Sequence, residues 1–221
     1  MPDERVQPPR LPRRLDRAPL EALTDQLELS MLRLDGGDFS SQEATGLILE
    51  EVIVERTSLA ETRLDRVRVL DAQWSTCDLS GGVWESARLV RTAFVECRLM
   101  GLHLVEAALT DVCFSACNMM GAIFVGADTS HVAFDGCNLR EASFQSTRLE
   151  GASFRDCDLR GADFQGALLT GADFRGAVID GMRIGPVEIQ GAIFEPAQAA
   201  QVVVLLGVEI RDKDDDQRGE G

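Results

Sequence analysis

The chain has 221 residues, of which 45% are hydrophobic, and this composition is sufficient to build the core of one domain. Its formal net charge is −15, so we expect the surface to repel nucleic acid and exclude direct binding of DNA or RNA. The first residues contain no apolar run of the length that a signal peptide or membrane span requires. We therefore expect a cytoplasmic protein without a membrane partner.

The N-terminal 29 residues divide into two segments. Residues 1–15 contain four prolines, four arginines and no apolar run, and we expect them to form a disordered tail. Contact of these arginines with an acidic partner is the alternative. Residues 16–29 are predicted to form a short capping helix, because Asp16 is a suitable N-cap. Three leucines follow it at helical spacing: Leu20, Leu23 and Leu27.

A repeat of five residues organises the next part of the chain, residues 30–195. The frame continues from Leu34 to Phe194 without an inserted or deleted residue, and all ten phenylalanines and both tryptophans occupy its central position i. A small residue usually stands two places earlier, at i−2. A period of five fits neither an α-helix nor a flat strand. It indicates a solenoid in which each unit forms one side and one corner of a coil.

A second period, of twenty residues, is nested in the first. Phenylalanine recurs at this interval from Phe94 to Phe194. Cysteine recurs at the same interval at position i−2: Cys77, Cys97, Cys117, Cys137 and Cys157. Twenty residues therefore correspond to one coil of four sides, and neighbouring coils are expected to pair as parallel strands in a rod of about eight coils.

The most regular units read CDLRG at 157–161, ADFQG at 162–166 and ADFRG at 172–176. This pattern resembles the pentapeptide-repeat proteins. The resemblance implies an all-β solenoid, a right-handed quadrilateral β-helix in which positions i and i−2 point inward. The absence of proline between Pro19 and Pro186 agrees with an uninterrupted hydrogen-bond ladder.

The pattern changes after Glu195. Residues 196–210 are predicted to form a C-terminal capping helix and a short strand, because Pro196 suits the first helical position and Gly207 suits the residue after the C-cap. The helix has an unbroken apolar run, which exceeds what one coil end can bury. We therefore expect a homodimer, as the C-terminal dimerisation known in the resembled family also implies. The dimerisation residues would be Val202, Val203, Leu205, Leu206, Val208 and Ile210. Residues 211–221 are expected to form an acidic disordered tail.

Residues with reactive side chains do not form an evident catalytic or metal site. Stacked cysteines have parallel Cβ vectors, which suit neither a disulfide nor tetrahedral zinc, so we expect buried, reduced thiols. Cys113 stands at i−1 and is expected to face outward, as are His103 and His131 on different coils. A coil filled by large apolar residues leaves no pocket. The chain is therefore not expected to be an enzyme or to bind a cofactor or metal.

One surface stretch differs from the rest. Between Leu99 and Leu139 there is no lysine or arginine, and several outward positions are apolar. The stacked pairs would be Met100 on Met120, His103 on Ile123, and Val105 on Val125. The carboxylates expected to flank them are Glu106, Asp111, Asp128 and Asp135. A contiguous apolar patch often marks a contact site, so we interpret this edge as a protein-binding surface. An apolar stripe without a partner is the alternative.

A rigid rod with regularly spaced carboxylates can present a field like that of duplex DNA. The resemblance implies the same function, because the Qnr-like and mycobacterial members of the family act as DNA mimics towards DNA gyrase. We therefore expect a non-enzymatic rod that binds a protein partner, with DNA gyrase as the candidate. The chain lacks the loops that interrupt the Qnr-type coil, so a structural scaffold with an unrelated partner and no DNA mimicry stays open.

Overall fold

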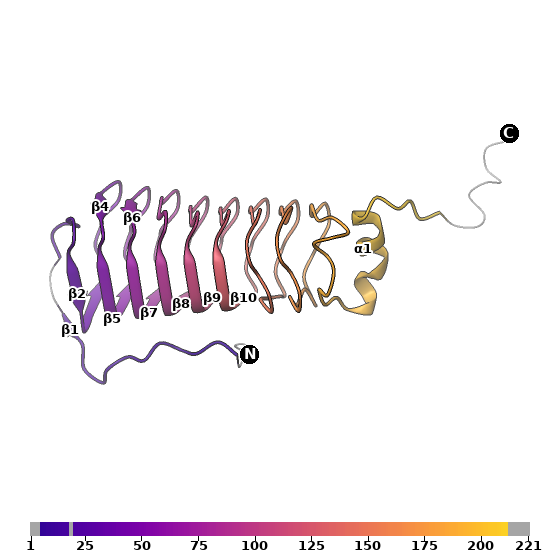
Figure 1. Cartoon of the computed structure of the whole chain (residues 1–221). Coiled ribbons are helices and arrows are strands. Elements are labelled where there is room, and N and C mark those ends of the chain that lie inside the picture. Colours follow the sequence, from indigo (N-terminus) through magenta and orange to yellow (C-terminus); the bar gives the residue numbers. More distant parts are fainter. Residues whose placement is uncertain (1–4, 18–19, 212–221) are drawn as a thin grey trace.

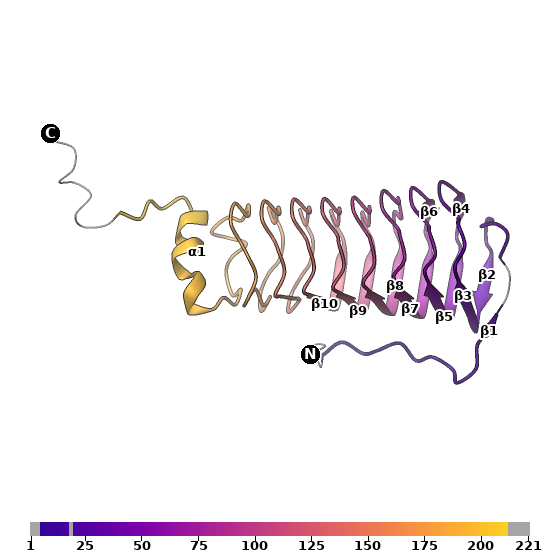
Figure 2. The ribbon, with the colours of Figure 1, turned by 180° about the vertical axis from the view of Figure 1, so that it is seen from behind.

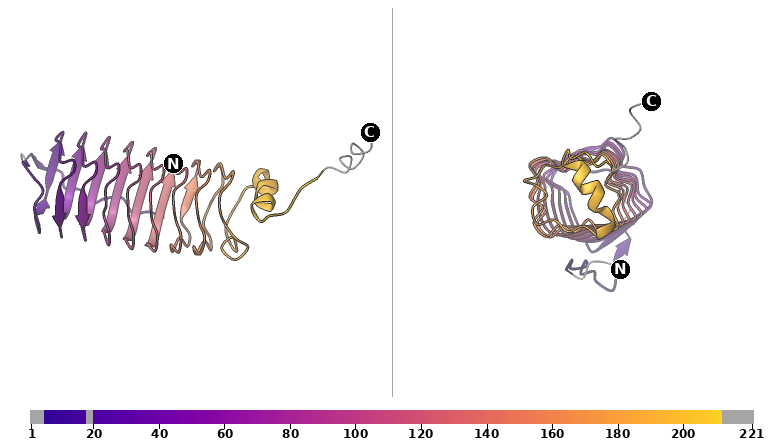
Figure 3. Two further views of the ribbon diagram at one scale, coloured as in Figure 1. Left: turned by 90° about the horizontal axis from the view of Figure 1, so that it is seen from above. Right: turned by 90° about the vertical axis from the view of Figure 1, so that its right-hand side faces the viewer.

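The computed structural model describes residues 5–17 and 20–211 and shows a parallel β-solenoid of about seven turns (Figure 1). The coils follow one another along one axis, and the view down that axis shows a four-sided outline (Figure 3). The solenoid that the five-residue period predicts is therefore confirmed, with about seven turns in place of the eight coils expected.

One long wall of the rod is a nine-stranded sheet in the order β1-β3-β5-β7-β8-β9-β10-β11, with β2 paired to β5. Strands β4 and β6 form a second, two-stranded sheet. The bounds are β1 Asp16–Arg17, β2 Glu28–Ser30, β3 Leu32–Asp35, β4 Glu43–Thr45, β5 Ile48–Glu55, β6 Arg63–Asp65, β7 Arg68–Ser75, β8 Arg88–Val95, β9 Ala108–Ser115, β10 Asp128–Asp135 and β11 Ser153–Arg155.

The register between strands equals the twenty-residue period. Phe94 of β8 pairs with Phe114 of β9, and Phe114 pairs with Phe134 of β10, all in parallel. The other walls are joined by single parallel bridges at the same step, such as His103 with Ile123. The prediction that twenty residues form one coil is therefore confirmed.

The core consists of stacked aromatic rings. Phe134 is 1% exposed and lies face to face with Phe114 and Phe154, at ring-centroid distances of 5.1 and 5.0 Å. A second column approaches it edge-on, with Phe124 and Phe144 both 5.8 Å away. Stacked and edge-to-face pairs are the two favourable aromatic geometries, and Phe134 takes part in both. A space of about 10 Å³ beside Trp74 is too small to hold a ligand.

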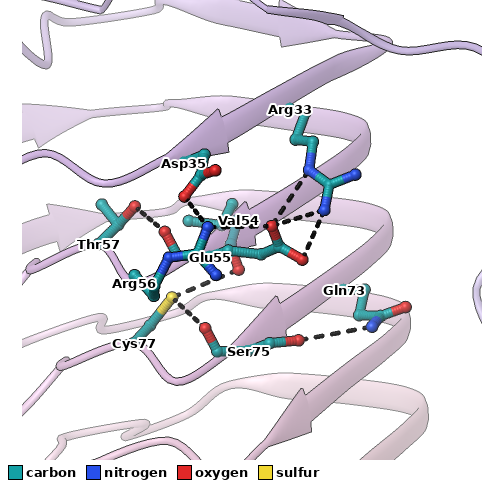
Figure 4. Close-up of polar contacts among 9 residues, drawn as sticks. All are labelled: Arg33, Asp35, Val54, Glu55, Arg56, Thr57, Gln73, Ser75 and Cys77. Carbon is teal, nitrogen blue, oxygen red and sulfur yellow. Dashed lines mark hydrogen bonds and ion pairs between the residues drawn. The ribbon is translucent and has the colours of Figure 1, made fainter.

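Position i−2 satisfies backbone groups inside the coil. The Cys77 thiol lies 3.4 Å from the carbonyl oxygens of Val54 and Ser75, and the Thr57 hydroxyl donates to the Glu55 carbonyl at 2.9 Å (Figure 4). A small side chain that carries a donor therefore fits this position, where it adds a hydrogen bond to carbonyls such as those of Glu55 and Ser75, which also accept backbone N–H groups at 2.9 and 3.0 Å. The five stacked cysteines are buried, as predicted.

The helix expected over residues 16–29 is not formed, and this prediction was wrong. The described residues of this segment form β1, a turn and β2, and Gln26 has a left-handed φ of 55°. Its backbone pairs with the next coil, since Gln26 N–H donates to the Thr45 carbonyl at 2.8 Å and Ile48 N–H donates to the Leu27 carbonyl at 2.9 Å. Hydrogen bonds between coils thus replace those within a helix. Leu20, Leu23 and Leu27 still pack on the core.

Residues 5–15 are also not the solvated tail that the composition predicts. They run along the outside of the rod, across successive coils (Figures 1 and 2). Arg10 N–H donates to the Asp71 carboxylate at 2.8 Å, and Gln7 N–H donates to that of Asp111 at 3.2 Å. We call residues 5–15 the N-terminal arm. Its composition gave no sign of these contacts, because they use backbone donors.

The C-terminal end is closed by a short 3₁₀ helix, η1 Pro196–Gln198, and by helix α1 Ala199–Leu205. The buried Gln198 side chain donates to the carbonyls of Phe174 and Ala177 at 2.9 and 2.8 Å, and so caps the last coil. Gly207 has a φ of 80°, as the C-cap prediction requires. The strand expected at 208–210 is absent, and the Val208 N–H instead donates back to the Val203 carbonyl of the helix at 3.2 Å. In residues 5–17 and 20–211, no helix is long and apolar enough to cross a membrane. The tail predicted at 211–221 lies outside the described residues, except for Arg211.

Candidate protein-interaction surface

The expected apolar pairs lie around one corner of the rod, on the two neighbouring sides that are joined by isolated bridges rather than by the long sheet. His103 and Ile123 are bridge partners, and Gly101 N–H donates to the Met120 carbonyl at 2.9 Å. Met120 is 37% exposed and the other members are half-buried. We call this set the apolar face, and it consists of Val83, Met100, His103, Val105, Met120, Ile123 and Val125.

Val83 is the member that the sequence reasoning missed. It is the parallel bridge partner of His103, one coil before it, and is half-buried like its neighbours. The signal was available, because Val83 stands one twenty-residue step before His103. It lies outside the stretch without lysine and arginine, which had set the limits of the predicted patch.

Only one of the four expected carboxylates flanks the apolar face. Glu106 is exposed at the corner after Val105, where its N–H donates to the Val125 carbonyl at 3.0 Å. The other three are carried by β9 and β10 of the long sheet, a different wall: Asp111, Asp128 and Asp135. The carboxylates expected to flank the patch are therefore divided between Glu106, at a corner of the apolar face, and three residues on the neighbouring long sheet.

These three carboxylates also have different surroundings. The Asp111 side chain is only 8% exposed, and its Oδ1 lies 3.3 Å from His131 Nδ1. Asp128 is exposed and lies 3.6 Å from the Arg148 guanidinium. Asp135 is half-buried beside the N-terminal arm. The three carboxylates therefore differ in exposure and in the groups that surround them.

Arginine neutralises several carboxylates on the later coils. Asp173 is 4% exposed and forms ion pairs of 2.8 Å with Arg175 and Arg155. Hydrogen bonds from Arg175 and then Arg155 hold the pKa of the Asp173 carboxyl well below its usual range. Asp163 likewise pairs with Arg183 at 3.0 Å. Earlier coils carry similar pairs, such as Asp71 with Arg91 and Asp78 with Arg98, both at 2.6 Å. Glu85 and Glu106 are exposed carboxylates next to the apolar face.

The reactive side chains form no evident centre. Among residues 5–17 and 20–211, no group of three or more His, Cys, Asp or Glu side chains could hold a metal ion. A hydrogen bond with Cys137, and then burial, raise the pKa of the Cys117 thiol to about 12, so this thiol stays protonated at neutral pH. Cys113 is half-buried rather than open, because residues 6–9 of the arm lie beside it.

The expected dimerisation residues divide into two groups. Val202 and Leu205 pack against the core and so close the rod. The others are exposed to solvent by 37–55%: Val203, Leu206, Val208 and Ile210. Val204, which the prediction left out of this set, is 55% exposed. One face of α1 is thus used for capping, and the opposite face carries apolar side chains without a covering element among the described residues.

A parallel four-sided coil with a filled core and an outer apolar face defines a β-solenoid protein. Residues 67–144 match the family model described as pentapeptide repeat region, and residues 137–176 match that described as pentapeptide repeats (8 copies). The chain belongs to the pentapeptide-repeat family. Among curated proteins, none matches the sequence significantly.

Solved structures with the same repeat resemble the chain at low identity. QnrB1, a plasmid-mediated fluoroquinolone resistance protein, is 14% identical over 85% of this chain and 99% of its own, with a TM-score of 0.39. HetL of the cyanobacterium Nostoc, a protein involved in heterocyst differentiation regulation, is 19% identical over 77% of this chain and 90% of its own, with a TM-score of 0.31. A pentapeptide repeat protein of the Arabidopsis thaliana thylakoid lumen is 20% identical over 49% of this chain and 72% of its own, with a TM-score of 0.26.

Proposed function

We propose that the chain is a non-enzymatic rod that binds a partner protein through its apolar face. The observation that carries the proposal is the set of apolar side chains around one corner of a rigid rod, which includes Met100, Met120 and Ile123, with no lysine or arginine between Leu99 and Leu139. Interface centres are poor in charged residues and rich in methionine and aromatic residues. The aromatic core fills the coil, so the outer surface is the part available for recognition.

We propose DNA gyrase as the partner, with the rod acting as a DNA mimic. A net charge of −15 and the exposed carboxylates Glu85 and Glu106 beside the apolar face support this choice. A surface that binds duplex DNA is basic and would attract such a rod electrostatically. The competing function is a structural scaffold for an unrelated protein. The arginine pairs favour the scaffold, because they interrupt the rows of negative charge on earlier and later coils alike.

A supercoiling assay with purified DNA gyrase distinguishes the two functions. We expect the chain to reduce supercoiling of relaxed plasmid at micromolar concentration, and added competitor DNA or higher salt to weaken the effect, because both compete for a charged site. Bovine serum albumin, another acidic protein, serves as the control for non-specific charge effects. Unchanged supercoiling at about tens of micromolar protein would reject the mimic and leave the scaffold.

We also propose that the chain forms a homodimer through the exposed apolar face of α1. Val204 and Leu206 support this, since apolar side chains at the end of a rod are otherwise left in water. Solenoid ends need a cover that prevents further stacking, and a second copy of the same helix provides one.

A further inference from the structure

The N-terminal arm contacts the rod through an ordered set of groups. The N–H of Arg10 donates to the Asp71 carboxylate, and the N–H of Gln7 donates to that of Asp111. Both acceptors occupy the same corner of the coil, two coils apart, and both side chains are only 8% exposed. A carboxylate this deeply buried needs a hydrogen-bond partner, and the arm backbone supplies one at each site.

The same corner places a basic side chain next to each carboxylate. Arg91, on the coil after Asp71, donates to it from Nε at 2.7 Å and from Nη2 at 2.6 Å. His131, on the coil after Asp111, places Nδ1 3.3 Å from it. Along this corner, a carboxylate that accepts a hydrogen bond from the arm alternates with a basic side chain that contacts the carboxylate. The order is Asp71, Arg91, Asp111, His131. The supporting side chains fix the carboxylates in place for the arm.

The spacing of the two acceptors matches an extended proline-rich chain. Two coils span about 9.6 Å at the strand separation of a β-sheet. Three residues of polyproline II helix, which is one turn, span about 9.3 Å. The N–H groups of residues 7 and 10 therefore point to the same side of the arm. Their separation matches that of the Asp111 and Asp71 carboxylates. Pro8 and Pro9 lie between the two donors and favour this conformation. Gln7 and Arg10 are not prolines, so each has an N–H to donate.

The arm and the wall of β8 and β9 enclose a mostly apolar hollow of about 280 Å³. The arm contributes Val6, Gln7, Pro8 and Pro9. The wall contributes Thr92, Ala93, Val95, Cys113, Ser115 and Asp135. This hollow is separate from the apolar face, which lies on the two bridged sides of the coil.

We propose that this corner and wall form a docking site for an extended, proline-rich peptide that presents two backbone N–H groups three residues apart, and that residues 6–10 of the chain fill the site in cis. The arm is then an internal ligand. It shields the wall around Cys113 from other proteins, and its release opens a second interaction surface for an extended proline-rich segment.

Alkylation of Cys113 in the full-length protein measures occupancy of the site. The five core cysteines are at most 2% exposed, so the rate at which the first iodoacetamide adduct forms reports on Cys113. The double variant Gln7→Pro/Arg10→Pro removes both donor N–H groups, leaves the rod unchanged and suits an extended arm. We expect its Cys113 to react at least about tenfold faster than that of the wild type, because two hydrogen bonds to carboxylates are lost.

Arg13→Pro is the matched control, because Arg13 is exposed and no hydrogen bond of its N–H is formed within the described part of the chain. It should react at the wild-type rate. A synthetic peptide of residues 5–15 should slow labelling of the double variant back towards that rate, and the same peptide with both proline substitutions should not. Equal labelling rates in the wild type and the double variant, or no protection by the peptide, would overturn the proposal.

Discussion

Replacing Phe134 with alanine is expected to lower the free energy of unfolding by about 3–5 kcal/mol. The ring is 1% exposed and packs against Phe114, Phe154, Phe124 and Phe144 at centroid distances of 5.1, 5.0, 5.8 and 5.8 Å. Its removal leaves a cavity that the hydrogen-bonded coils above and below cannot close. Urea unfolding monitored by circular dichroism measures the loss.

Phe194→Ala provides the matched control. Phe194 occupies the last position of the same column, is half-buried, and stacks on Phe174 alone at 5.1 Å. Its loss should cost less than half as much as that of Phe134, because the end of the rod can relax and water already reaches the ring. If the two substitutions were equally destabilising, the stacked core would not be the source of stability that the structure indicates.

Introducing lysine at Val204 and Leu206 together is expected to convert a dimer into a monomer. These side chains are 55% and 37% exposed in the single chain and would lie in the centre of the helix-to-helix contact. Burying two unpaired ammonium groups there would weaken association by about hundredfold or more. Light scattering at micromolar concentration should give twice the chain mass of 24.1 kDa for the wild type and 24.1 kDa for the variant.

Leu168→Lys tests whether any added charge has this effect. Leu168 is 51% exposed and lies more than one coil before α1, where it is the bridge partner of Arg148. This variant should remain a dimer. A wild-type protein that is monomeric at these concentrations would contradict the proposed dimer directly.

The repeat allowed much of the fold to be predicted. Because each coil repeats the last, the position of Phe134 in its unit also determines its burial, its strand and its partners Phe114 and Phe154. The same periodicity correctly paired His103 with Ile123. In a solenoid, the spacing of the sequence repeat therefore also gives the residues that contact one another in the fold. Globular domains rarely have this property.

The ends of the chain and the charged surface were predicted less well. The spacing of Leu20, Leu23 and Leu27 is helical, yet backbone hydrogen bonds with the next coil determine their conformation. Only the structure shows which backbone groups of that coil can form these bonds. Asp111 likewise appeared to be a surface charge. It is buried because an arm more than a hundred residues earlier in the chain donates to it, at a sequence separation of 104.

The direct test of the proposed function compares two matched double variants in the gyrase supercoiling assay. Met120→Lys/Val125→Lys places two charges on the apolar face, and Leu168→Lys/Val187→Lys places the same charges at exposed apolar positions elsewhere. The account predicts that the first variant loses inhibition at least about tenfold in concentration, since each lysine would have to be desolvated in the contact. The second should inhibit like the wild type. Equal inhibition by both variants would contradict recognition through the apolar face.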